Sequence, residues 1–142
     1  MGGVVWIGGV LAAGWSAMLC WYDLKYARLP DRLTLPACVL AIGAVALDPE
    51  LFVGVLWPAA YFLFGRGIGG GDVKLALPLG VAAAAWGGLM GVNLAILVSS
   101  LCTLCFALLA RSSRVPHGPS MLLASWALVG LSVGNGIFWG EV

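Results

Sequence analysis

Two aspartates stand where a long uncharged stretch meets polar residues. Asp23 directly follows the uncharged residues 4–22, and Asp72 lies between three glycines and the uncharged residues 75–110. An ionisable side chain at such a boundary is costly, so its presence favours a function. Both carboxyl groups are expected at the same depth, at the ends of two helices, where they can converge.

Two carboxyl groups that are held close together do not ionise independently, because the second negative charge is opposed by the first. The ionised group takes a proton from water and the protonated group polarises a carbonyl oxygen. Water then attacks an amide without a covalent enzyme intermediate, as in aspartic peptidases. The glycines before Asp72, among them Gly69 and Gly71, lack a Cβ and let the backbone approach an extended peptide.

Each aspartate also has a purely structural interpretation. It is then either a solvated loop residue or the partner of a nearby base such as Lys25, Arg28 or Lys74. For Asp31, which lies in a polar turn, the structural interpretation is preferred. We expect Asp31 to cap a helix that begins near Leu33.

The composition indicates a solvent that is mostly lipid. Of the 142 residues, 62% are hydrophobic and only 9% are charged, whereas roughly a quarter of the residues in a soluble domain are charged. This excludes a soluble globular domain, a disordered chain and a nucleic-acid binder. We therefore expect an all-α membrane protein with a single transmembrane domain over residues 1–142.

The charges divide the chain into apolar segments that predict about six helices. The run 75–110 has 36 uncharged residues, or roughly 54 Å of helix, whereas a hydrocarbon core is about 30 Å thick. It should fold back on itself near Gly87, Gly88 and Gly91 and supply two spans. The other spans are expected over residues 4–22, 33–47, 51–64 and 120–139. The second and third are short, but we expect both to cross rather than to form a shallow hairpin.

Charge segregation predicts the orientation. Six alternating spans with the amino terminus outside place every basic residue on one side, which is then the cytoplasmic side. The opposite side holds Asp48, Glu50 and Glu141. The basic residues are Lys25, Arg28, Arg32, Arg66, Lys74, Arg111 and Arg114.

Three motifs, in order, resemble those of the prepilin peptidases, which are also called type IV leader peptidases and are aspartic peptidases of the GxGD type. Residues 23–36 resemble the first motif, and residues 69–75, with the sequence GGGDVKL, resemble the second. Residues 115–119 resemble a third motif, usually Pro-Phe-Gly-Pro, with His117 in place of Phe. The resemblance implies that Asp23 and Asp72 are the catalytic pair. It places Gly69, Gly71, Lys74 and Asp31 in supporting or substrate-binding positions.

The resemblance also implies a substrate. It is a prepilin or pseudopilin precursor, whose basic leader is removed at the cytoplasmic face of the inner membrane, just before the hydrophobic helix. No cofactor, metal or nucleic acid is implied. Many members carry a long cytoplasmic insertion with paired CxxC motifs and also methylate the new amino terminus. This chain resembles the short form without that insertion, which leaves methylation open.

Two other classes of function stay open at the level of sequence. A small proton or cation transporter or channel subunit also needs membrane-facing acids, but it should place them near mid-span. A structural subunit of a pilus or secretion apparatus would use the aspartates in interface salt bridges. The pair Cys102 and Cys105 has CxxC spacing, but its apolar flanks favour packing over a functional dithiol.

Overall fold

The computed structural model describes residues 2–112 and 115–134, and within these ranges the secondary structure consists of helices and the segments that connect them, without a strand. This confirms the predicted all-α class. The elements are α1 (Gly2–Tyr26), α2 (Asp31–Leu47), a 3₁₀-helix η1 (Pro49–Val55), α3 (Leu56–Phe64), α4 (Gly70–Ala110) and α5 (Gly118–Gly134). Arg114, Glu141 and the predicted last span beyond residue 134 lie outside the described residues.

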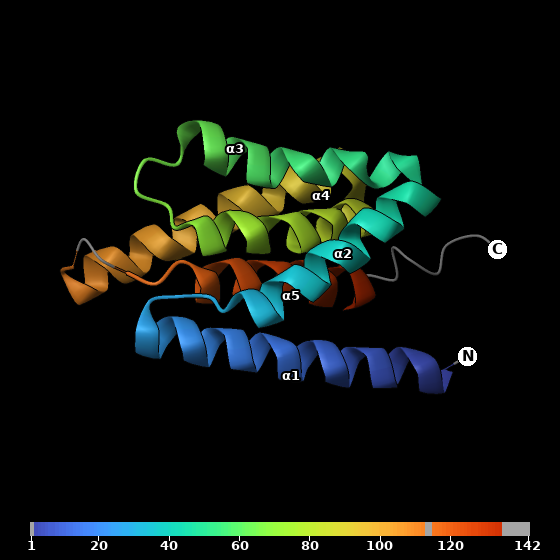
Figure 1. Ribbon diagram of the computed structural model, residues 1–142, viewed down its shortest axis with the longest axis horizontal. Helices are drawn as coiled ribbons and strands as arrows, with labels where there is room; N and C mark the ends of the chain where they lie inside the picture. Colours follow the sequence, from blue (N-terminus) through green and yellow to red (C-terminus); the bar gives the residue numbers. More distant parts are fainter. Residues whose placement is uncertain (1, 113–114, 135–142) are drawn as a thin grey trace.

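Helix α4 bends back on itself at two adjacent glycines, as its apolar length predicts. Gly87 and Gly88 have non-helical backbone angles, and the φ of Gly88 is +54°, a conformation that glycine adopts at little cost. Beyond the bend, Gly91 lies so close to the other arm that a Cβ there would stand 2.5 Å from the carbonyl oxygen of Ala83. The two arms run in opposite directions along the bundle (Figure 1).

The bend gathers three chain connections at one end of the bundle. In Figure 1 the α1–α2 and α3–α4 connections and the start of α5 all lie at the left-hand end. The turn between α2 and η1 and the bend in α4 lie at the opposite end. The chain therefore brings the carboxyl end of α1 and the amino ends of α4 and α5 into one neighbourhood.

The predicted helix over residues 51–64 is not uniform. Its first part is the 3₁₀-helix η1, and the α-helical part starts only at Leu56. Pro58 supplies a reason, because it has no N–H to donate to the carbonyl of Gly54 four residues earlier. Gly54 in turn packs backbone to backbone against α4, where a Cβ on Gly54 would stand 2.5 Å from the carbonyl carbon of Gly80.

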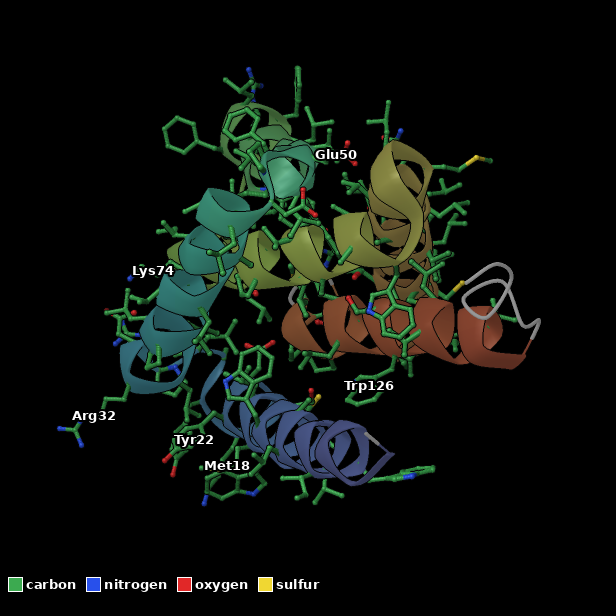
Figure 2. The ribbon with its side chains drawn as sticks, turned by 90° about the vertical axis from the view of Figure 1, so that its right-hand side faces the viewer. Met18, Tyr22, Arg32, Glu50, Lys74 and Trp126 are labelled. Atoms are coloured by element: carbon green, nitrogen blue, oxygen red, sulfur yellow. The ribbon has the colours of Figure 1, made fainter. Side chains whose placement is uncertain are left out.

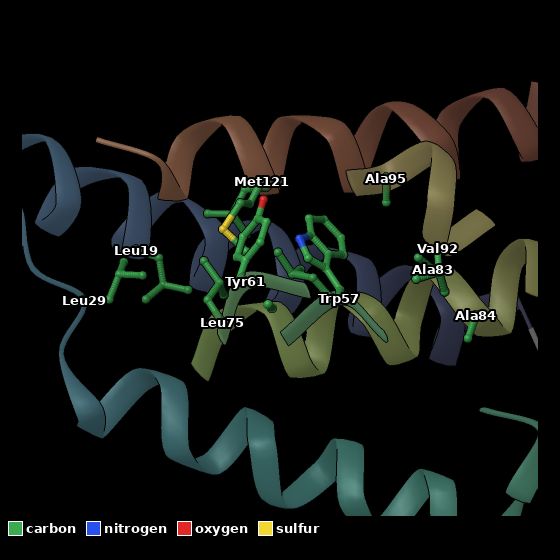
Figure 3. Packing of buried hydrophobic residues seen from close by; sticks show 13 residues of the cluster. Leu19, Leu29, Trp57, Tyr61, Leu75, Ala83, Ala84, Val92, Ala95 and Met121 are labelled. Atoms are coloured by element: carbon green, nitrogen blue, oxygen red, sulfur yellow. The ribbon is translucent and has the colours of Figure 1, made fainter. Parts of the chain in front are cut away.

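The core lies between α3, α4 and α5, with one contribution from α1. Trp57 and Tyr61 of α3 point towards α5, where the side chain of Met121 lies next to Tyr61 (Figure 3). Leu75 of α4 and Leu19 of α1 complete the part of the cluster nearest the α1–α2 connection. Trp57, Leu75, Met121 and Leu19 are all fully buried, so the cluster forms the packed interior of the bundle.

The outer surface is strongly apolar. Large hydrophobic side chains are exposed on every helix, among them Trp6, Phe64 and Leu109 at 78%, 81% and 81%. Among the described residues, Gly70–Ala110 is the one helix long and apolar enough to cross a membrane, while Pro49–Phe64 and Gly118–Leu131 are shorter apolar helices. By contrast, Arg32 and Lys74 project together on one side of the bundle (Figure 2). An apolar exterior of this extent requires a partner or lipid to cover it.

Candidate active site

Asp23 lies on the face of α1 that packs against α5. Ser16, Leu19 and Asp23 are buried at helical spacing, and the Asp23 side chain is only 5% exposed. The helix ends one turn later, where Ala27 adopts a left-handed φ of 48° and its N–H donates to the carbonyl of Asp23 at 2.9 Å. The acid is therefore held on a rigid helix, one turn from the connection to α2.

The first residue of α5 binds the Asp23 carboxyl group. The backbone N–H of Gly118 donates to Asp23 Oδ2 at 2.9 Å in a buried hydrogen bond. A free N–H at a helix amino terminus carries partial positive charge and favours a carboxylate. A Cβ on residue 118 would stand 2.7 Å from Oδ2, so only glycine permits this approach.

Asp72 lies in the first turn of α4. Gly69 precedes the helix in an extended conformation, and the N–H of Asp72 donates to the carbonyl of Gly69 at 3.0 Å. The Asp72 carboxyl group is close to the glycine run, because a Cβ on Gly69 would stand 3.7 Å from its Oδ2. The turn thus directs the acid back over the glycine-rich segment.

The two carboxyl groups influence each other. Burial, and after it the negative charge of Asp23, raises the pKa of Asp72 to about 6, against a smaller lowering by a backbone hydrogen bond from Gly69. Burial also raises the pKa of Asp23, and the hydrogen bond from Gly118 opposes that rise. Each carboxyl group thus accepts a backbone hydrogen bond, but the rise in pKa is larger at Asp72 than at Asp23, and such a difference between neighbouring acids is what a base and an acid require.

Leu29 explains the need for a small residue at position 71. This buried side chain lies in the α1–α2 connection, and a Cβ on Gly71 would stand 3.0 Å from its Cβ. A Cβ on Gly118 would be 3.5 Å from Leu29 Cδ2. Leu29 therefore packs between the first residues of α4 and α5, close to both acids.

Asp31 and Lys74 form an ion pair away from the two acids. Lys74 Nζ lies 2.7 Å from Asp31 Oδ1, and the side chains are 42% and 58% exposed. The predicted capping role of Asp31 is wrong, because α2 begins at Asp31 itself and the carboxylate binds Lys74 instead. Exposed pairs of this kind contribute at most about 1 kcal/mol, so the pair ties α2 to the start of α4 without dominating stability.

His117 has a partner on each ring nitrogen. Its Nε2 lies 2.7 Å from the hydroxyl of Tyr61, and its Nδ1 binds the hydroxyl of Thr103. The contacts of Tyr61, Thr103, Leu29 and the Gly118 amide were not predicted from the sequence. A hydroxyl within an otherwise apolar span was the one available signal for the first two.

An apolar groove of about 540 Å³ opens beside Asp23, between α1 and α5. Cys20, one turn before Asp23, and Pro119, directly after Gly118, contribute to its wall. Farther along, Trp126 Nε1 donates to Ser16 Oγ at 3.0 Å and joins the two helices. The site therefore continues along the bundle as an apolar surface.

Comparison with known proteins gives a consistent family. A profile of the type IV leader peptidase family matches residues 10–109, which include both acids. No solved structure matches the chain.

Three curated relatives are each described as a prepilin leader peptidase/N-methyltransferase. The protein from Xanthomonas campestris pv. campestris is 28% identical over 94% of this chain and 50% of its own length. Those from Dichelobacter nodosus and Neisseria gonorrhoeae are 30% and 32% identical, over 91% and 86% of this chain and 51% and 48% of theirs. The chain thus spans about half the length of the curated relatives it matches. On the extent of the profile match and these identities, the chain belongs to the type IV leader peptidase family.

Proposed function

We propose that the protein is an aspartic endopeptidase that removes the basic leader of type IV prepilin or pseudopilin precursors. The observation that carries the proposal is the pair Asp23 and Asp72, delivered by α1 and α4 to one end of the bundle and coupled through their charges. Family membership supports the substrate class. Methylation of the new amino terminus is not part of the proposal.

The asymmetry of the pair assigns the roles. Gly118 N–H favours the ionised form of Asp23, and the pKa of Asp23 is raised less than that of Asp72, so Asp23 is the acid that accepts a proton from the attacking water. Asp72, whose pKa is raised to about 6, keeps its proton to a higher pH than Asp23 and in its protonated form donates it to the oxygen of the scissile carbonyl. The resulting tetrahedral diol collapses when Asp23 returns its proton to the leaving nitrogen, and Asp72 recovers a proton from the diol. The two acids thereby exchange roles within each turnover.

The membrane arrangement is also a proposal. We infer six spans with the amino terminus outside, so that the acids lie at the cytoplasmic edge of the inner membrane. The two arms of α4 supply two of the spans, and the apolar exterior supports contact with lipid. The connections that carry Arg28 and Arg66 lie at the same end as the acids, whereas the turn that carries Asp48 lies at the other end (Figure 1), in keeping with positive-inside orientation.

The groove beside Asp23 suits a precursor of this kind. A prepilin has an apolar helix directly after its cleavage site, and the groove is apolar and begins within one turn of Asp23. A peptide whose apolar part lies along α1 and α5 would bring the preceding residues to the acids. The apolar groove would thus contact the apolar helix of the precursor, and the end of the bundle that carries the acids would contact the leader and the cleavage site.

Substitution of each acid tests the function. In membranes with a co-expressed prepilin, Asp23→Asn and Asp72→Asn should each lower leader cleavage by about 100-fold or more, since each removes one proton-transfer group. Asp48→Asn at the opposite end is the matched control and should cleave normally, and immunoblotting should find all three variants inserted at equal levels. Normal cleavage by either site variant would refute the assignment.

A further inference from the structure

A closed circuit of polar side chains lies behind Gly118. Tyr61 of α3, Ser99 and Thr103 of the second arm of α4, and His117 at the start of α5 are its members. Tyr61 Oη lies 2.7 Å from His117 Nε2 and 3.4 Å from Ser99 Oγ. Thr103 Oγ1 binds His117 Nδ1 and donates to the Ser99 carbonyl at 3.0 Å.

The protons in this circuit can be placed from two facts: a backbone carbonyl only accepts hydrogen bonds, and the His117 ring is neutral. The Thr103 hydroxyl proton is directed to the Ser99 carbonyl, so Thr103 Oγ1 must accept from His117 Nδ1–H. Burial lowers the pKa of His117 and favours the neutral ring, whose Nε2 then accepts from the Tyr61 hydroxyl. Ser99 O–H is left to donate to the Tyr61 oxygen.

The hydrogen bonds of the circuit restrain His117, which directly precedes the residue that binds Asp23. His117 is held on both edges of its ring by two different elements, and Gly118, its covalent neighbour, donates its N–H to Asp23 Oδ2. Ser99 and Tyr61 are buried, so the anchor is rigid. The two ring contacts restrain the side-chain torsions of His117 and, together with the hydrogen bond from Met121 N–H to the His117 carbonyl at 3.2 Å, the backbone that carries the Gly118 amide.

We propose that His117 is a positioning residue that, through this circuit, holds the Gly118 amide on Asp23 and thereby sets which acid is ionised. The inference rests on the proposed function for its meaning in catalysis, but the geometry it describes can be measured without cleavage.

The expected effect concerns the ionisation of Asp23, so the groups around that carboxyl matter. Asp72 of α4 and Cys20 of α1 both lie within reach of the charge of Asp23, and His117 directly precedes its hydrogen-bond donor Gly118. Helix α5, which packs on α1, contributes no titratable side chain. Loss of a hydrogen bond to a carboxylate raises the pKa of that carboxyl, here by about one pH unit.

Thr103 offers a matched pair of variants outside the catalytic contact. Thr103→Val keeps the shape and removes the acceptor of His117 Nδ1–H, whereas Thr103→Ser keeps the hydroxyl. In protein labelled with ¹³C at the side-chain carboxyl of its aspartates, the signal lost in Asp23→Asn identifies Asp23. We expect its titration midpoint to rise by about one pH unit in Thr103→Val and to remain at the wild-type value in Thr103→Ser.

Cleavage of a purified prepilin in nanodiscs provides the second readout. The acid limb of kcat/KM should move upward by the same amount in Thr103→Val and stay in place in Thr103→Ser. Tyr61→Phe, which removes the donor to Nε2, should also move it and serves if Thr103→Val does not fold. Unchanged Asp23 titration in folded Thr103→Val or Tyr61→Phe would overturn the positioning role. If the wild type does not cleave prepilin while the titration shifts as expected, the proposed function fails and the positioning inference stands.

Discussion

Removing the charge of Asp72 should stabilise the fold while it abolishes cleavage. Burial and the neighbouring charge of Asp23 raise the pKa of Asp72 from 3.8 to about 6, so the folded state binds this proton more tightly than the unfolded state. Between pH 3.8 and about 6, stability should therefore fall as the pH rises. Above that window the ionised carboxyl costs the folded protein about 3 kcal/mol relative to a neutral group. Asp72→Asn is neutral throughout and avoids that cost.

The assay is unfolding of the purified protein in mixed micelles by added SDS, followed by the fluorescence of its seven tryptophans. At pH 8 the free energy of unfolding of Asp72→Asn should exceed that of the wild type by about 3 kcal/mol. Near pH 3.5 the difference should shrink to a few tenths of a kcal/mol, because wild-type Asp72 is then largely protonated in both states. Glu50→Gln, at the exposed opposite end, should follow the wild type at both pH values. Equal stability of Asp72→Asn and wild type at pH 8 would refute the idea that a desolvated carboxyl stands beside Asp23.

Two glycine positions give further predictions, with Gly130→Ala as the control for both because a Cβ there meets nothing within 4 Å. Gly118→Ala should lower kcat/KM for prepilin by about 100-fold, since the added methyl displaces the Asp23 carboxyl group; cleavage at the control rate would contradict the contact. Gly80→Ala should lower the free energy of unfolding by about 1–3 kcal/mol in the SDS titration, because the methyl would be forced into the backbone of Gly54; a stability equal to that of the control would show that η1 can move aside.

Features governed by length and by single residues were predictable from the sequence. The return of the chain within residues 75–110 follows from a helix too long for one bilayer, and the three glycines named for it include the two that bend. Over residues 51–64 the structure has a 3₁₀-helix followed by an α-helix in place of the one continuous helix that was predicted. The cause is local and was present in the sequence, in the spacing of Gly54 and Pro58. The composition alone did not reveal it, because both residues also occur within membrane helices.

The candidate site was predictable only in part. The two acids were found from their position at the ends of apolar runs, whereas their catalytic role stays a prediction. The capping role given to Asp31 was wrong because its actual partner, Lys74, lies on a different helix. The same reason hid the contacts of His117, whose partners lie on α3 and on the far arm of α4. Contacts between distant segments depend on how helices are arranged, which residue spacing along one helix does not reveal.

The reversal at Gly87 and Gly88 also bears on how the molecule is assembled. Asp72 lies at the start of one arm of α4, and the other arm carries Thr103, whose hydroxyl binds His117, so the two halves of the site are joined through the bend at the far end of the bundle. A nascent chain that has inserted only the first arm of α4 contains Asp72. It does not yet hold Thr103 in place, so His117 and the Gly118 amide that binds Asp23 are not yet positioned. If the protein is a peptidase as proposed, its activity should therefore arise only after both arms of α4 have inserted, so that an incomplete chain does not cleave other membrane proteins during biogenesis.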